Sequence, residues 1–111
     1  MKPFYSTNSD EKYVYVRTGN ISSSYTTTKI VLPNKYTTSN INKICSAVEE
    51  ILVIIDDGNV LYRENAFYDS SWAIVQELTT LNKQSHIVKI VDADNAFYIL
   101  CDDGYLYNYK K

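Results

Sequence analysis

Two pairs of adjacent carboxylates, Asp56–Asp57 and Asp102–Asp103, are the residues whose type could most directly do chemistry. Paired carboxylates can bind calcium or serve as acid and base in sugar hydrolysis. Each pair is followed by a glycine, and neither has a glutamate at the spacing of a calcium-binding loop. Asp-Gly is the dipeptide of tight hairpin turns, so we expect both pairs to form turns rather than a metal or catalytic site.

Other reactive side chains lack the partners that catalysis requires. His86 is the single histidine, and no motif joins it to a serine or cysteine. Cys45 and Cys101 show no CxxC spacing, which argues against zinc and favours two small buried thiols, although their number permits a disulfide. The sequence contains no GxSxG, P-loop or GxGxxG motif. We therefore expect no enzyme activity, cofactor or metal.

A set of aromatic residues with one arginine is the stronger candidate for binding. Aromatic rings stack on sugars and anchor protein interfaces, and an arginine is a suitable polar neighbour. The alternative is that these rings only pack between sheets, and the tryptophan in particular could act as a wedge at the start of a strand. The candidate residues are Tyr62, Arg63, Trp72, Tyr105 and Tyr107.

Charge argues against nucleic acid and membranes as partners. Eleven basic and thirteen acidic residues leave a net charge of −2, which gives no general attraction to polyanions. The ending YLYNYKK, with Tyr109, Lys110 and Lys111, could stack on single-stranded nucleic acid. An edge strand whose lysines prevent wrong pairing is the favoured interpretation.

Length and hydropathy indicate one soluble domain over residues 1–111. No apolar run approaches the ~18 residues of a membrane span, and the first residues lack the apolar core of a signal peptide. Two reduced cysteines fit a cytoplasmic location, which we expect. The eleven tyrosines, with many isoleucines and lysines, are typical of an AT-rich genome, which could be viral, protist or bacterial.

The chain repeats itself. INKICSAVEEILVIIDDGNVLY, which begins at Ile41, aligns with IVKIVDADNAFYILCDDGYLY, which begins at Ile87, when Gly58 is placed over Gly104. Tyr62 falls opposite Asn108 without a gap and opposite Tyr107 with one. A weaker upstream copy, YVYVRTGNI, places Gly19 at the turn. The three copies cover roughly residues 12–40, 41–86 and 87–111.

Each copy predicts short antiparallel strands. A strand such as NKICSA or VKIVDA precedes a hairpin closed by DDG, and SYTTTKIVLP and SSWAIVQEL could each supply a fourth strand. A short helix competes only around 75–81. Glycine spacings of 39 and 46 residues match one propeller blade.

The hairpin strands also predict burial on both faces. Residues 51–55 are all apolar, and residues 96–100 nearly so, whereas a half-buried strand alternates with polar residues. Stacked sheets would cover both faces. About two and a half blades cannot close a ring of the usual 4–8. We therefore expect several chains to assemble, a partner to cover the last sheet, or the sheets to fold into a sandwich.

The segment from residue 41 to residue 62 resembles the repeat of the regulator of chromosome condensation family. The shared pattern is a short I-x-x-I strand, a small-residue turn, an apolar strand, Asp-Gly and an aromatic-containing strand, found also at 87–107 and faintly at 12–21. Ala47 and Ala93 lie near the place where that family has a glycine. The resemblance implies a β-propeller with protein partners and, in a few members, nucleotide exchange on a small GTPase.

The linker LYRENAFYDSSWAIVQEL resembles a second propeller family, the tectonin repeat. The matching residues are Tyr62, Arg63 and Trp72: an aromatic–Arg pair closes one blade and a tryptophan opens the next strand. This resemblance implies recognition of carbohydrate or lipopolysaccharide.

Together these features predict an all-β fold of about two and a half four-stranded antiparallel propeller-like blades, incomplete alone or completed by oligomerisation. We expect a non-catalytic structural or protein-interaction module that self-associates or binds another protein. The alternative is a tectonin-like lectin that binds carbohydrate, and an enzyme or GTPase regulator is less favoured.

Overall fold

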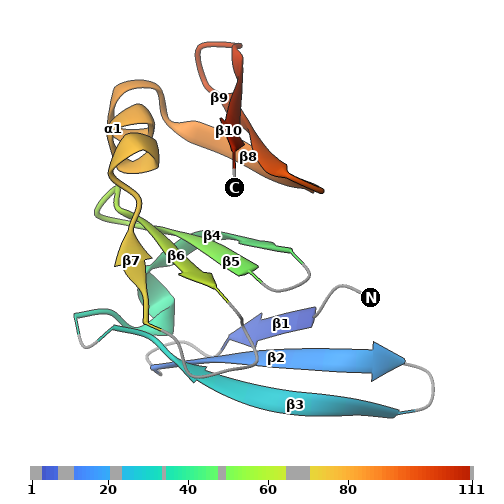
Figure 1. Ribbon diagram of the computed structural model, residues 1–111. Coiled ribbons are helices and arrows are strands. Elements are labelled where there is room, and N and C mark those ends of the chain that lie inside the picture. Colours follow the sequence, from blue (N-terminus) through green and yellow to red (C-terminus); the bar gives the residue numbers. More distant parts are fainter. Residues whose placement is uncertain are drawn as a thin grey trace.

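Three small antiparallel β-sheets lie one above another in the computed structural model of the chain (Figure 1). Sheet A has the order β1-β2-β3, sheet B the order β4-β5-β6-β7, and sheet C the order β10-β9-β8. The strands are β1 (Phe4–Thr7), β2 (Tyr13–Asn20), β3 (Ser24–Val31), β4 (Ile41–Ser46), β5 (Glu50–Ile55), β6 (Val60–Glu64), β7 (Ala73–Ile74), β8 (Ile87–Ala93), β9 (Ala96–Cys101) and β10 (Leu106–Lys110). The structure describes residues 4–7, 12–20, 24–33, 35–47, 50–64 and 71–110.

Two hydrophobic cores hold the three layers together, and sheet B lies between them. The core between sheets A and B consists of Val14, Ile30, Leu32, Tyr36, Ile51, Val53, Ile55 and Leu61. The core between sheets B and C consists of Ala47, Leu52, Ile54, Val60, Leu78, Ile87, Phe97, Ile99 and Cys101. Residues 51–55 are therefore buried on alternate sides of β5, which confirms the expectation that both faces of this strand are covered. The same expectation for residues 96–100 is wrong within this chain, because Tyr98 and Leu100 on one face of β9 are exposed.

Sheets B and C follow the same plan, 46 residues apart in the chain. Both first strands shift register at the corresponding place, over 41–43 in β4 and over 87–89 in β8. Such a shift marks a bulge, which bends and twists the strand. Tyr62 lies opposite Leu52, and Asn108 lies opposite Tyr98. The two copies therefore align without a gap, with Tyr62 in the place of Asn108.

The DDG segments form hairpin turns, as predicted. Gly58 and Gly104 have φ angles of 96° and 85°, a region that favours glycine. The Gly58 N–H donates to the carbonyl of Ile55, and the Gly104 N–H donates to that of Cys101. These bonds and the positive φ fit a type I turn followed by a glycine bulge.

The upstream copy differs from this plan. Gly19 lies inside β2 and pairs with Tyr25 of β3, so the prediction that it occupies a turn equivalent to that of Gly58 is wrong. Of the three sheets, only sheet B has four strands among the described residues, and sheets A and C have three each. The prediction of four-stranded units therefore holds for sheet B alone. No sheet closes on itself in the described part of the chain.

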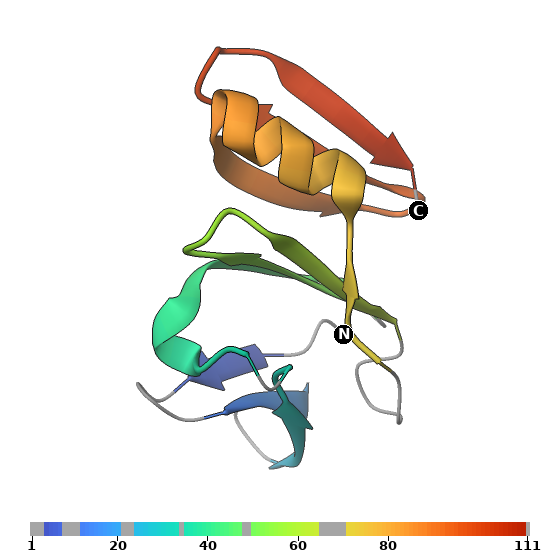
Figure 2. The same cartoon turned by 90° about the vertical axis from the view of Figure 1, so that its left-hand side faces the viewer.

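The segment SSWAIVQEL supplies a fourth strand to sheet B, but this strand is short and a helix begins within the segment. Strand β7 has only two residues, Ala73 and Ile74, and helix α1 (Gln76–Ser85) follows. Leu78 enters the core between sheets B and C, and the hydroxyl of Thr79 accepts a 3.0 Å hydrogen bond from the Val60 N–H. Packing against sheet B thus outweighs the β propensity of this segment. Figure 2 shows α1 alongside sheet C.

Helix α1 ends at Ser85, and the next residue, His86, has a φ of 40° and leads the chain into β8. Asn82 bridges this end of the helix to both sheets. Its amide donates to the Gly58 carbonyl at 3.1 Å, and its oxygen accepts from the Ile87 N–H at 2.8 Å. Within the described ranges, no helix has the length and apolar character needed to cross a membrane.

Candidate interaction surface

The outer face of sheet C, the side that points away from sheet B, is apolar and exposed. Strand alternation directs Phe97, Ile99 and Cys101 inward and the residues between them outward. Val91 of β8 pairs with Tyr98, and Leu106 of β10 pairs with Leu100, so these two side chains point to the same outward side. We define the outer face of sheet C as Val91, Tyr98, Leu100 and Leu106.

The corresponding positions in sheet B are fully covered. We define the covered face of sheet B as Leu52, Ile54 and Val60, which are 0%, 3% and 0% exposed. Their counterparts 46 residues later, Tyr98, Leu100 and Leu106, are 39%, 37% and 64% exposed. The same side of the same repeat is thus a core in one sheet and a surface in the next. Adjoining exposed apolar side chains of this kind are typical of interaction sites.

Positive charge accompanies this apolar surface. Lys89 pairs with Leu100, and Lys110 pairs with Ala96, so strand alternation places both lysines on the outer side, where they are exposed. Asp92 pairs instead with the inward-facing Phe97. Over β8–β10, the charged residues in register with the outer face are therefore the two lysines.

The three candidates from the linker do not form one site. Tyr62 and Arg63 are adjacent in β6 and so point to opposite faces of sheet B. Tyr62 packs against the core shared with sheet C, and its hydroxyl donates to Glu50 at 3.3 Å. Burial and the carboxylates of Glu50 and Glu64 raise the pKa of Tyr62 far above its usual range.

Trp72 packs against the core between sheets A and B, on the other side of sheet B. Its indole N–H donates to the carbonyl of Val31 at 2.8 Å, and the Arg63 guanidinium lies 6.0 Å from its ring centre. The ring therefore joins the segment after β6 to sheet A, in the position expected of a packing wedge.

Tyr105 lies just before β10, after the turn that follows β9, and Tyr107 lies in β10. Their ring centres are 6.4 Å apart, and Tyr105 is 69% exposed. The Tyr107 hydroxyl donates to the Asp103 carboxylate at 2.9 Å. The pKa of Tyr107 is raised, mainly because of this hydrogen bond.

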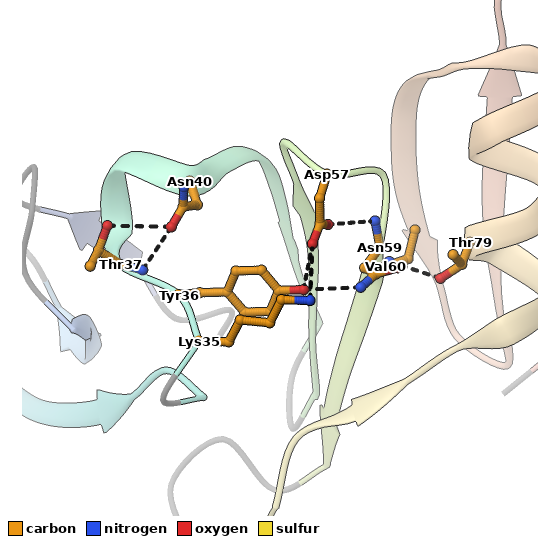
Figure 3. A network of polar contacts seen from close by, with 8 residues as sticks. All are labelled: Lys35, Tyr36, Thr37, Asn40, Asp57, Asn59, Val60 and Thr79. Atoms are coloured by element: carbon orange, nitrogen blue, oxygen red, sulfur yellow. Dashed lines mark hydrogen bonds and ion pairs between the residues drawn. The ribbon is translucent and has the colours of Figure 1, made fainter.

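A polar network surrounds the turn of sheet B (Figure 3). The Asp57 carboxylate accepts from the Tyr36 hydroxyl at 2.7 Å and from the Asn59 N–H at 3.0 Å, and Lys35 lies 3.8 Å away. Burial alone would raise the pKa of Asp57, but the hydrogen bonds and Lys35, with Lys83, outweigh it and lower the pKa. The carboxylate is thus held ionised as a turn residue.

The turn of sheet C repeats this arrangement. Asp103 accepts from the Tyr105 N–H at 2.9 Å as well as from Tyr107. These bonds, the backbone one foremost, lower the pKa of Asp103. Burial, together with the Asp103 charge, raises the pKa of the Cys101 thiol and keeps it protonated. Cys45 and Cys101 form no disulfide.

An open cleft of about 590 Å³ lies where the first strands of sheets B and C begin. Lysines and aspartates line it together, among them Lys43, Lys83, Asp57 and Asp102, along with His86. Across the residues that the structure describes, no three histidine, cysteine or acidic side chains are grouped so that they could hold a metal ion. The mixed charges of the cleft indicate no particular ligand.

The candidate set drawn from the sequence contains none of the four residues that define the outer face of sheet C. Leu100 and Leu106 could have been found from the ungapped alignment, because they lie in the places of Ile54 and Val60. Comparisons with protein-family models, characterised proteins and solved structures find no match to this chain.

Proposed function

We propose that this chain is a non-catalytic structural or interaction module, built from propeller-like β repeats, that self-associates through the outer face of sheet C. The observation that carries the proposal is the contrast in exposure between this face and the covered face of sheet B. A repeat that keeps an apolar side in the absence of a covering sheet is expected to find cover in another molecule.

The propeller-like character is part of the proposal. It is supported by the four-strand meander of sheet B, by the face-to-face stacking of the sheets and by the 46-residue spacing of sheets B and C. The described residues form three sheets, whereas propellers usually have 4–8 blades; in this proposal, contacts between copies add further sheets.

The test is the mass in solution, measured by light scattering after size-exclusion chromatography over a concentration series. We expect the parent chain to exceed the monomer mass as its concentration rises. Leu100→Glu should weaken association on the order of tenfold or more, because it places a charge at the centre of the apolar face. Lys89, directly across from this position, should pair with the new carboxylate and preserve the fold.

Ile74→Glu is the matched control. Ile74 is 55% exposed but belongs to β7 of sheet B, so this variant should associate like the parent. A parent chain that stays monomeric at every concentration would contradict the proposal.

Carbohydrate recognition is the second candidate function. It is favoured by the exposed Tyr105 ring beside Tyr107, because aromatic faces stack on sugar rings. A glycan array with the parent and with Tyr105→Ala tests it: binding should fall in the variant. An array without binding, or equal binding by both proteins, would remove this candidate. Loss of glycan binding in Trp72→Ala would indicate the tectonin-like arrangement, whereas loss in Tyr105→Ala alone would indicate a site at Tyr105.

A further inference from the structure

The outer side of sheet C has a pattern of charge and side-chain size that is complementary to itself. Resting on the proposed self-association, we infer that the contact has twofold symmetry: the outer face of sheet C packs on the same face of a second copy, with the strands of the two copies antiparallel. The twofold axis lies between the two sheets, perpendicular to their strands, and passes through the row that contains Tyr98.

Strand register arranges the outward side chains of sheet C in three rows. The first has a lysine and two leucines, and we call it the leucine row. The third has two alanines and a lysine, and we call it the alanine row. From β8 to β10 the rows are Lys89, Leu100 and Leu106; Val91, Tyr98 and Asn108; and Ala93, Ala96 and Lys110.

Side-chain size favours antiparallel over parallel strands in the two copies. The antiparallel arrangement places the leucine row of each copy over the alanine row of the other, so Leu100 lies over Ala96. Leu106 lies over the aliphatic part of Lys110, whose ammonium group stays in water. Large side chains that face small ones allow two layers to interdigitate. With parallel strands, the leucine rows would meet each other and the alanine rows would leave a gap.

Charge favours the same arrangement. Lys89 lies in the leucine row, and Asp94 is exposed in the turn that follows Ala93, at the other end of β8. Within one chain, five residues of strand separate the two by ~16 Å, which exceeds the Debye length of about 8 Å at physiological ionic strength. In the antiparallel arrangement Lys89 of each copy reaches the turn of the other, so two pairs of opposite charge form. No lysine of these rows then faces another lysine.

The face that covers sheet B within the chain is not free in a second copy. Phe97 and Ile99 of sheet C provide that cover, and both are 0% exposed. The outer face of sheet C, by contrast, is exposed in every copy. One patch that packs on its own equivalent gives a closed dimer, which is the commonest form of homo-oligomer.

The small size of this face indicates a weak dimer. Three strands ~4.8 Å apart, each with five residues of ~3.3 Å, give roughly 250 Å², whereas a standard interface has ~800 Å² per partner. The dimer should therefore form only toward the high end of a concentration series. Because each chain uses its one patch, the mass should level off at twice that of the chain.

The experiment reverses charges in full-length variants and follows their mass by light scattering. Lys89→Glu or Asp94→Lys alone should weaken dimerisation roughly three- to thirtyfold, because two attractive pairs become repulsive. An equimolar mixture should recover the parent affinity, because the heterodimer keeps one original pair and gains one reversed pair. Lys43→Glu, at the equivalent position of sheet B, is the matched control and should dimerise like the parent.

The other outcomes separate this inference from the proposed function. A mass that rises beyond twice that of the chain, or a mixture that associates no better than its two components, would overturn the twofold contact and leave the role of sheet C standing. If Leu100→Glu associates like the parent, the proposed function itself is wrong.

Circular dichroism checks that each variant is folded. Among the described residues other than glycine, only His86 has a positive φ, so lysine fits the backbone at position 94. Lys89→Gln and Asp94→Asn replace a variant that fails to fold, and each should weaken dimerisation by less than the charge reversal. Association of both neutral variants at the parent affinity would also overturn the twofold contact.

Discussion

Sheets B and C present the same repeat in two environments. Their turns, bulges and strand registers correspond at a spacing of 46 residues, yet the covered face of sheet B is buried and the outer face of sheet C is not. The local plan is therefore set by backbone features that each copy carries itself. Burial, by contrast, depends on whether a neighbouring sheet is present.

The largest expected effect comes from truncating corresponding residues on these two faces. Leu52→Ala should lower the free energy of unfolding by about 2–5 kcal/mol, because it empties a fully buried site. Tyr98→Ala, at the equivalent position, should cost less than ~1 kcal/mol in dilute solution. Urea denaturation of the monomer measures both. Equal losses would show that sheet C is covered within the single chain.

Alanine substitutions at the two turn glycines should differ much less in their effect on stability. Alanine at Gly58 or Gly104 must adopt a positive φ, which should cost about 1–2 kcal/mol at either site. A Cβ at Gly58 would also lie 3.1 Å from the Cε of Lys83, whereas at Gly104 it would meet nothing within 4 Å. Thermal unfolding should therefore rank Gly58→Ala slightly below Gly104→Ala in stability. The reverse order would contradict the placement of the Lys83 side chain.

The smallest effect concerns acid sensitivity of the two turns. The pKa values of Asp57 and Asp103 are lowered in the folded chain. Each carboxylate therefore stabilises the fold above its unfolded pKa, and this stabilisation is lost as the pH falls through the folded pKa, below about 4. Tyr36→Phe should raise the pKa of Asp57 and leave that of Asp103 unchanged, and Tyr107→Phe should do the opposite.

Carboxyl-carbon NMR titrations of the two variants measure these shifts directly. Each variant is the control for the other, because the two networks share no residue. Identical titration curves in both variants and the parent would mean that neither hydroxyl contributes to the acid stability of its turn.

Much of sheets B and C could be predicted from sequence because their signals are local. The DDG turns require glycine at positive φ, and an uninterrupted apolar run such as 51–55 requires cover on both sides. The prediction that Gly19 lies in a turn was wrong because a single glycine does not distinguish a turn from a strand interior. Its surroundings, with β-branched and aromatic residues on both sides, also fit the long hairpin that it actually joins.

Helix α1 and the candidate surface depended on contacts that sequence does not display. The residues that neighbour Leu78 in the sequence do not indicate that its side chain enters the core between sheets B and C. Trp72 and Arg63 were identified by type, but their position at the junction with sheet A is a tertiary feature. The outer face of sheet C could be found only by asking which repeated apolar positions lack a covering sheet.

The position of Trp72 also makes the chain its own optical probe. It is the only tryptophan in the sequence and is hydrogen-bonded across the junction of sheets A and B. Its fluorescence should therefore report the separation of sheet A from sheet B and remain insensitive to the release of sheet C. Stacked repeats can unfold stepwise, so the difference between fluorescence and circular dichroism midpoints would measure how independently the third sheet melts.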